Sequence, residues 1–111
     1  MNIDDLRAWG ANVDEGLARC MNNEAFYLRL VGMETADKNF EGMRAALAAG
    51  DVHAAFEAAH AIKGAAGNLA LTPIYEPVCE LTELLRGRTE PVEADALVDQ
   101  IMEQREKARR L

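Results

Sequence analysis

Apolar residues recur along this chain at intervals of three and four, and no alternating pattern lasts long enough to predict a β-strand. That spacing places apolar side chains on one face of an α-helix, which leaves water only by packing against other helices. Because the predicted helices are long and their connections short, we expect an all-α fold: an up-down four-helix bundle with one or two short additional N-terminal helices. With 111 residues, of which 50% are hydrophobic, the chain can bury the core of a single domain over residues 1–111.

Two short helices are expected before the bundle. Leu6 and Trp9 mark the first of them, and Val13 and Leu17 mark the second. Asn12 is the predicted N-cap of the second helix, because its side chain can accept a hydrogen bond from an N–H group that the first helical turn leaves free.

The pattern between residues 23 and 50 is longer. The residues that it places on buried faces are Phe26, Leu30 and Met33, and then Ala36, Phe40, Met43 and Leu47. Gly50 is the predicted C-terminal stop of this part. Asp51 is the predicted N-cap of the next helix, which we expect to run to about Leu71.

Two further helices are expected after Leu71. The first would start at Thr72-Pro73 and bury a stripe formed by Ile74, Val78, Leu81 and Leu85. Pro77 conflicts with a regular helix, because it lacks an N–H group and clashes with the preceding turn. Either the regular helix begins near Glu76 or it is kinked. Gly87 would end it, and the last helix would bury Leu97, Val98, Ile101 and Met102.

The charge balance disfavours two classes of partner. The chain has 12 Lys and Arg residues against 19 Asp and Glu residues, a formal net charge of −7. A nucleic-acid-binding domain needs a basic face to neutralise phosphates, and an anionic membrane surface attracts basic segments. We therefore expect neither nucleic acid nor membrane as a partner, although a charge of this size also simply favours solubility.

Nothing in the sequence predicts export or a membrane anchor. No apolar run approaches the roughly 18 residues of a membrane span, and the N-terminus lacks the basic and apolar regions of a secretory signal. Cys20 and Cys79 lie far apart and have no metal-ligand spacing. We expect reduced thiols and a cytoplasmic location.

His60 is expected on the outer face of the segment from Asp51 to Leu71. With a turn of about 100° per residue, the residues opposite His60 form a core stripe: Ala55, Ala58, Ile62, Ala65 and Leu69. The residues on the same side as His60 are His53, Phe56, Glu57, Lys63, Gly64, Gly67 and Leu71. A histidine there is exposed, and a neutral imidazole has one ring nitrogen that is free to attack.

Gly64 and Gly67 lie on the same face although each costs about 0.8–1.0 kcal/mol relative to alanine inside a helix. Their small size would leave a bare patch of backbone beside His60, and Lys63 would bring a positive charge suited to a phosphoryl group. The arrangement fits a nucleophile that a large partner must reach. The alternative is an ordinary surface histidine on a helix whose small residues serve close packing.

The run "HAIKGAAGNL", residues 60–69, resembles the signature of histidine phosphotransfer (HPt) domains of bacterial multistep phosphorelays. The resemblance extends upstream through "NVDEGLARCMNNEAFYLRLV" and "ALAAGDVHAAFEAAH" and covers roughly residues 10 to 90. One position departs from it, since Ala70 stands where the family usually has glycine. We expect slightly changed packing at the end of the helix and no loss of function.

The resemblance implies a four-helix bundle in which His60 takes a phosphoryl group from a receiver-domain aspartyl phosphate and passes it to another receiver. It further implies that Lys63 stabilises phosphate charge and Gly64 gives access. Phe56 and Gly67 are the predicted receiver docking face, although Phe56 could equally pack against a neighbouring helix edge. The domain would be a phosphocarrier and no enzyme, with catalysis supplied largely by the receiver.

The partners implied by the resemblance are response-regulator receiver domains, a hybrid sensor histidine kinase, or both. No cofactor or metal of its own is expected, and Mg²⁺ would sit on the partner receiver. We expect a monomer, and the initial Met1 favours, without deciding, a free-standing protein. Two alternatives stay open: an interaction-only bundle that docks receivers or kinases without phosphoryl flux, and a small enzyme, which would lack a second catalytic group.

Overall fold

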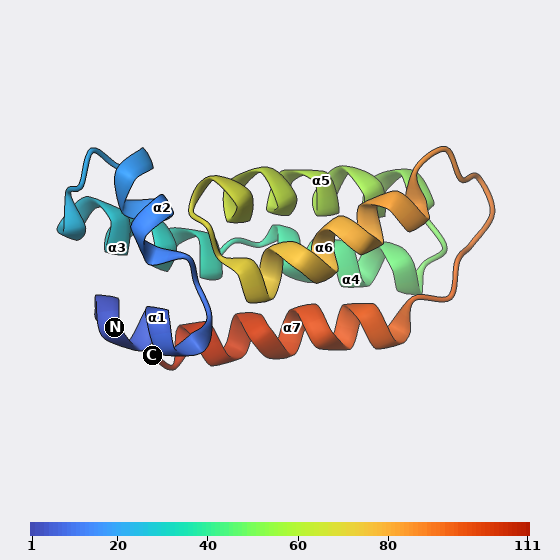
Figure 1. The fold of residues 1–111 in the computed structure, drawn as a ribbon. Helices are drawn as coiled ribbons and strands as arrows, with labels where there is room; N and C mark the ends of the chain where they lie inside the picture. The colour runs from blue at the N-terminus through green and yellow to red at the C-terminus, as the bar shows by residue number, and fades with distance from the viewer.

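The computed structural model describes residues 1–111 and contains seven α-helices and no strand (Figure 1). The helices are α1 (Ile3–Trp9), α2 (Val13–Arg19), α3 (Glu24–Thr35), α4 (Asn39–Ala48), α5 (Val52–Asn68), α6 (Thr72–Leu85) and α7 (Asp95–Arg109). The predicted all-α fold with two short N-terminal helices is confirmed. No helix combines the length and the apolar character that crossing a membrane would require.

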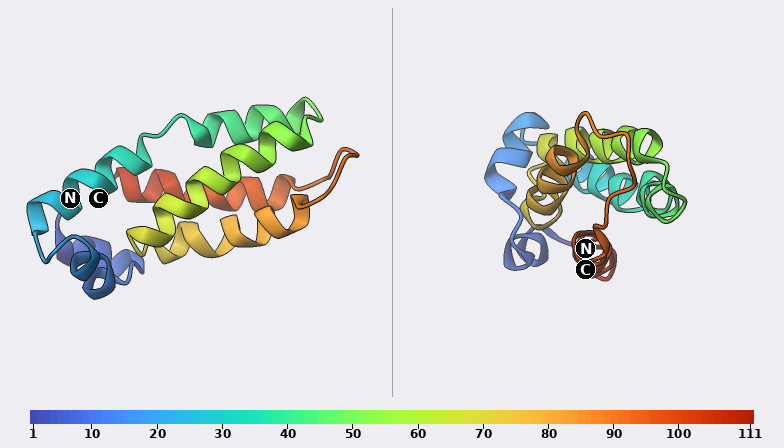
Figure 2. Two further views of the ribbon diagram at one scale, coloured as in Figure 1. Left: turned by 90° about the horizontal axis from the view of Figure 1, so that it is seen from above. Right: turned by 90° about the vertical axis from the view of Figure 1, so that its right-hand side faces the viewer.

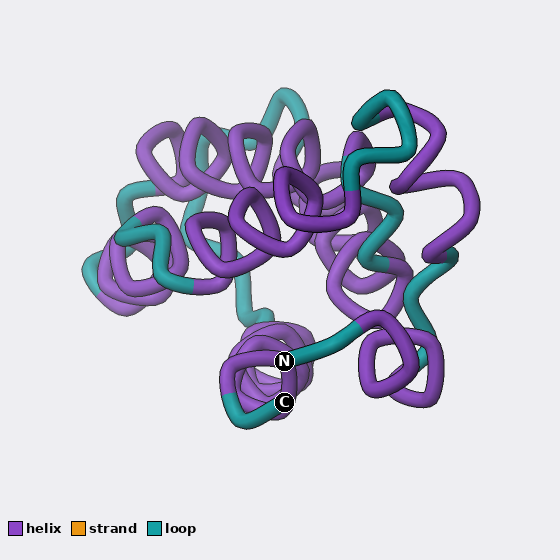
Figure 3. Tube along the Cα trace, turned by 90° about the vertical axis from the view of Figure 1, so that its left-hand side faces the viewer, coloured by secondary structure: helices purple, strands orange, loops and turns teal.

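The bundle has four legs that run up and down in turn. α3 and α4 lie end to end and form the first leg, and α5, α6 and α7 are the other three (Figure 2). α5 packs between α4 and α6, and α7 packs against α6 and α3. α1 and α2 cover one end of the bundle, where the two chain termini lie side by side (Figure 3).

Local sequence signals define most helix ends. The side chains of Asn12 and Asp51 accept hydrogen bonds from backbone N–H groups of the first turns of α2 and α5, at 3.3 and 3.1 Å, which confirms both predicted N-caps. Gly50 and Gly87 follow the C-caps of α4 and α6 with φ angles of +75° and +69°. Glycine adopts this left-handed backbone without steric cost and so stops both helices where predicted.

The buried face of α3 differs from the predicted one. Phe26 is 36% exposed and Met33 63%, and the buried residues are Tyr27, Val31, Glu34 and Thr35. The Tyr27 hydroxyl donates to the Leu69 carbonyl at 2.9 Å, and Gly16 of α2 lies so close to the ring that a Cβ there would come within 2.5 Å of it. These tertiary contacts set the rotation of α3, which apolar spacing alone does not determine.

The first leg is broken between α3 and α4. Ala36 caps α3 and is exposed, so its predicted place in the core is wrong. Buried Arg105 of α7 stabilises the chain at this break. Its contacts are hydrogen bonds to the carbonyls of Thr35 (2.6 Å) and Asp37 (3.2 Å), an ion pair with Glu41 (3.0 Å) and a cation–π contact with the Phe40 ring (4.7 Å). A charged side chain that is 4% exposed is stabilised here by carbonyls and a partner charge.

α6 starts at Thr72 and continues past Pro77, so the alternative start near Glu76 is wrong. Pro73 lies in the first turn, where a missing N–H group costs nothing. Pro77 lies inside the helix and is buried, and the Pro73 carbonyl therefore receives no helical N–H from it. The predicted apolar stripe is fully or almost fully buried, and its packing offsets the loss of this hydrogen bond. Its residues are Ile74, Val78, Leu81 and Leu85.

The last helix agrees with its prediction in part. Val98 and Ile101 of α7 are buried, whereas Leu97 and Met102 are half-buried and pack against the edge of the core. The additional buried positions are Arg105 and Ala108. The pattern missed Arg105 because a charged side chain is normally exposed.

Candidate functional site

α5 is the central element of the candidate site. Its buried residues are Val52, Ala55, Ala59, Ile62 and Ala66, and Leu69 follows as its buried C-cap. The predicted core stripe is confirmed in part, because Ala58 and Ala65 are only half-buried and Ala58 packs against the edge of the core. α5 packs against α4 on one side and α6 on the other, so its buried face is centred between these neighbours, and alanine spacing alone cannot reveal that centre.

His60 lies on the exposed face of α5, as predicted. It lines an open groove of about 580 Å³ together with Lys63, Gly64 and Gly67 of the same helix. Arg19 of α2 and Tyr75 of α6 are among the other lining residues. The structure thus brings Lys63, Gly64 and Gly67 together with His60 and adds side chains from two other helices. The other α5 residues that the sequence placed on this face line a separate groove: His53, Phe56 and Glu57.

Leu71 is fully buried and lies outside α5, which ends at Asn68. The helix ends in a Schellman motif, in which the Leu71 N–H donates to the Ala66 carbonyl (2.9 Å) and the Ala70 N–H to the Gly67 carbonyl (3.1 Å). Ala70 adopts a left-handed φ of +57°, the conformation that favours glycine. The prediction that Leu71 shares the face of His60 is wrong because the helix has already ended.

Gly64 borders open space. A Cβ atom built on it would meet no heavy atom within 4 Å, so the packing of the free protein does not require glycine at this position. Gly67 differs, because a Cβ there would come within 2.7 Å of the Tyr75 ring. Gly67 therefore lets α5 and α6 approach closely, a packing role that the sequence did not reveal, and its docking role stays a prediction.

The His60 ring is stacked on Phe56, with ring centroids 5.8 Å apart and an interplanar angle of 21°. The Arg86 guanidinium at the end of α6 lies 5.5 Å from the centroid of the Phe56 ring. Phe56 is half-buried and packs against the edge of the core, which is the alternative that the sequence left open. This stack limits the orientations of the imidazole, and a docking role of Phe56 stays a prediction.

Charged groups of α6 lie close to Phe56 and Lys63 of α5. Glu83 accepts hydrogen bonds from the Nε and Nη2 atoms of Arg86 at 3.2 and 2.9 Å. The hydrogen bonds and charge of Arg86 lower the pKa of the Glu83 carboxyl, and the nearby Lys63 ammonium contributes in the same direction. Lys63 is thus close enough to α6 to interact with Glu83.

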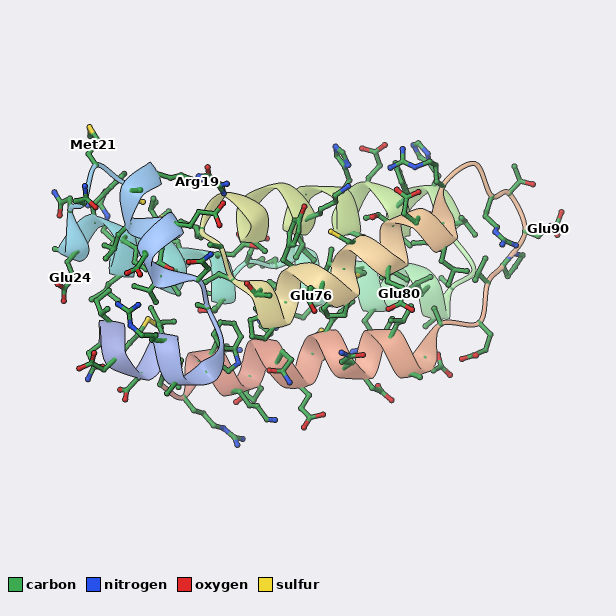
Figure 4. The ribbon with its side chains drawn as sticks, in the orientation of Figure 1. Arg19, Met21, Glu24, Glu76, Glu80 and Glu90 are labelled. Atoms are coloured by element: carbon green, nitrogen blue, oxygen red, sulfur yellow. The ribbon has the colours of Figure 1, made fainter.

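Arg19 reaches the other end of the groove from α2 (Figure 4). Its Nη1 atom donates to the Gly67 carbonyl at 2.5 Å, and its Nη2 atom pairs with Glu15. A side-chain hydrogen bond with Cys79 raises the pKa of Tyr75, whereas the charge of Arg19 lowers it. No sequence signal near His60 reveals Arg19 or Tyr75, because each comes from a different helix.

No group of three or more His, Cys, Asp or Glu side chains is arranged to hold a metal ion. His53 is exposed, and its Nε2 atom lies 3.9 Å from the Oε1 atom of Glu57, one turn along the same helix. The prediction that the chain holds no cofactor of its own stays a prediction. The chemistry that the groove offers is an exposed imidazole, a neighbouring cation and free access.

Comparison with known protein families shows which family the bundle belongs to. The Hpt domain family matches residues 29–109, a range that covers most of the first leg and all of the other three. Searches of curated proteins and of solved structures found no match. The family match covers well over half of the chain and implies a role in histidine phosphotransfer and interaction with receiver or kinase domains. This chain therefore belongs to the Hpt domain family.

Proposed function

We propose that this protein is a phosphorelay intermediate that uses His60 as its phosphoryl acceptor. His60 accepts the group from the aspartyl phosphate of one receiver domain and passes it to the aspartate of another. The observation that carries the proposal is the exposure of His60 in an open groove, with Lys63 beside it and open space at Gly64. The match to the Hpt domain family supports the same function.

In the proposed step, a ring nitrogen of His60 attacks phosphorus and forms a P–N bond. The P–O bond to the aspartate of the receiver breaks, and the aspartate leaves as a carboxylate with the bonding electron pair. The entering and leaving atoms lie in line, and negative charge spreads over the three equatorial oxygens. Lys63 stabilises that charge, and the stabilisation grows as the docked receiver excludes water. The second transfer is the reverse step with a different aspartate.

Glu15 is the one carboxylate that lines the groove, and it forms an ion pair with Arg19. A Mg²⁺ ion prefers oxygen ligands such as carboxylates and phosphate groups. We therefore assign the Mg²⁺ ion and the acidic pocket to the partner receiver. On this view, the chain is a phosphocarrier and no enzyme, and catalysis is supplied largely by the partner.

The proposed docking face includes Phe56, Gly64 and Gly67, which precede and follow His60 along α5. The absence of a Cβ at Gly64 gives a receiver room to reach the imidazole. The partners would be response-regulator receiver domains, a hybrid sensor histidine kinase, or both. We further propose that residues 1–111 act as one monomeric domain.

The direct test is incubation with a phosphorylated receiver, followed by an acid-lability test of the label that the chain acquires. His60→Gln should abolish labelling and leave the helix content measured by circular dichroism unchanged. His53→Gln is the matched control, because it removes an exposed histidine from the same helix, and it should retain labelling. Undiminished labelling of His60→Gln would refute the assignment. Receiver binding without any label would favour an interaction-only bundle.

A further inference from the structure

The groove beside His60 contains a second cation, Arg19, which the proposed transfer step does not use. We propose that Arg19 determines which receiver docks, by pairing with an acidic side chain on the receiver surface next to its phosphorylated aspartate. This inference rests on the proposed function and identifies the kind of partner that the groove fits.

Arg19 and His60 occupy different ends of the groove. The guanidinium is bonded to the carbonyl of Gly67, which lies seven residues beyond His60. With a rise of 1.5 Å per residue, this separation is roughly 10 Å along α5. Arg19 is thus too far away to share one phosphoryl group with His60. A docked domain that places its aspartyl phosphate at His60 would instead cover Arg19 with the surface around its active site.

The guanidinium is held in place before any partner arrives. It donates to the Gly67 carbonyl through Nη1 and pairs with Glu15 through Nη2, while its side chain remains 42% exposed. Guanidinium has five N–H donors in a planar fork, so donors remain for a partner carboxylate. Because the side chain is already ordered, a partner loses little entropy in pairing with it.

The charge of the groove is opposite to that of the whole chain. Two cations, Lys63 and Arg19, and one carboxylate, Glu15, line the groove, so its charge is positive in a protein whose formal net charge is −7. A receiver that binds Mg²⁺ with carboxylates is itself acidic around its active site, so the chain as a whole repels it. Complementary charge at the groove therefore favours one docking position and discriminates among partners more than it raises affinity.

A purely structural role for Arg19 predicts different behaviour. The hydrogen bond to Gly67 joins α2 to the end of α5, and its loss alone would lower stability and disturb His60 with every phosphodonor. Arg19→Gln keeps a hydrogen-bond donor and removes the charge. Arg7→Gln is the matched control, since Arg7 is an exposed cation of α1 that pairs with Asp14 and does not line the groove.

The experiment compares a small phosphodonor with a panel of receiver domains. Phosphoramidate should label His60 at the same rate in the wild type, Arg19→Gln and Arg7→Gln, because it needs no docking. In single-turnover transfer from the receiver that the wild type prefers, the kcat/KM of Arg19→Gln should be about five- to tenfold lower than that of the wild type. Most of this loss should come from a higher KM and less from a lower kcat. Its preference among receivers and the salt dependence of transfer should also shrink.

Three outcomes would overturn the proposal. Equal transfer by Arg19→Gln and Arg7→Gln with every receiver would show that Arg19 selects nothing. A parallel loss of stability and of phosphoramidate labelling would reduce Arg19 to a structural contact. An unchanged loss after the acidic side chains of the preferred receiver are replaced by amides would exclude the proposed pair. Binding of unphosphorylated receivers decides the Arg19 proposal separately, even if His60 accepts no label and the proposed function fails.

Discussion

The two glycines that follow His60 on α5 have different surroundings. A Cβ at Gly64 would point into open space, whereas a Cβ at Gly67 would collide with the Tyr75 ring. The sequence grouped both glycines as a bare patch for a partner. At the scale of single residues, the structure separates a position kept open on the surface from a position needed for helix packing.

Substitution distinguishes the two glycines. Gly64→Ala should raise the free energy of unfolding by up to about 1 kcal/mol, because alanine is the better helix former and nothing obstructs its methyl group. Gly67→Ala should lower it by about 1 kcal/mol, since the Tyr75 ring must move away. Urea denaturation measures both changes. Gly64→Leu should fold normally and block transfer from a receiver, and normal transfer by this variant would show that access is not the reason for the glycine.

Lys63 is expected to act through its charge. Lys63→Ala should slow single-turnover transfer from a labelled receiver, while binding weakens less, because the equatorial oxygens gain charge only during transfer. Lys63→Arg should retain part of the activity, since the charge survives with a different shape. The measurement needs transfer rates and receiver binding followed separately. Wild-type transfer rates in both variants would show that Lys63 is a surface residue with no role in transfer.

At the scale of the helix, the end of α5 combines a Schellman motif with an unusual residue. Ala70 takes the left-handed conformation there, which costs an L-residue roughly 1–2 kcal/mol. The motif still forms, because two backbone hydrogen bonds and the burial of Leu71 hold the turn. Packing therefore outweighs local backbone preference at this position.

Ala70→Gly should raise the free energy of unfolding by up to about 1 kcal/mol. Relief of the left-handed strain exceeds the loss of one buried methyl group, which is worth about 0.8 kcal/mol. Ala66→Gly is the matched control, because Ala66 is fully buried inside α5 and the same change there should be destabilising. Thermal or urea denaturation provides the comparison. Equal destabilisation by both changes would contradict the strain at Ala70.

At the scale of the whole molecule, the first leg depends on a buried charged cluster between α3, α4 and α7. Glu34 is 6% exposed, and its Oε1 atom has no hydrogen-bond partner. Burial, helped by the charge of Asp37, raises the pKa of Glu34 from 4.5 to about 7, although Arg105 opposes the shift. The folded protein therefore favours the protonated form of Glu34 across the range from about pH 4.5 to about pH 7.

This cluster predicts a pH dependence with a definite sign. Because the pKa of Glu34 is higher in the folded state, the folded state binds more protons and loses stability as the pH rises from about 4.5 to about 7. Glu34→Gln removes this loss. Its stability relative to the wild type should rise by up to about 3 kcal/mol between pH 4.5 and pH 8.

Urea denaturation at a series of pH values measures that difference. Glu76→Gln is the matched control, because it removes the same charge from an exposed position on α6 (Figure 4). A stability difference between Glu34→Gln and the wild type that stays constant with pH would contradict the burial of a titrating carboxyl at this position.

Local sequence by itself determined the helices and which face of α5 is exposed. Helical spacing, the caps at Asn12 and Asp51 and the stop at Gly50 act within a few residues, so they can be read without the fold. The exposure of His60 and Gly64 followed from the turn of a single helix. Their resemblance to HPt domains was likewise contained in one short run of residues.

Only the tertiary structure decided how these elements meet. The rotation of α3 depends on the hydrogen bond from Tyr27 to Leu69, which joins residues 42 positions apart. Arg19 enters the groove from a helix 48 positions before its acceptor Gly67, and Arg105 holds the α3–α4 break from the far end of the chain. Such contacts depend on which helix faces are brought together. The periodicity of one helix shows that a face is apolar, but the neighbours on both sides decide which of its residues are buried.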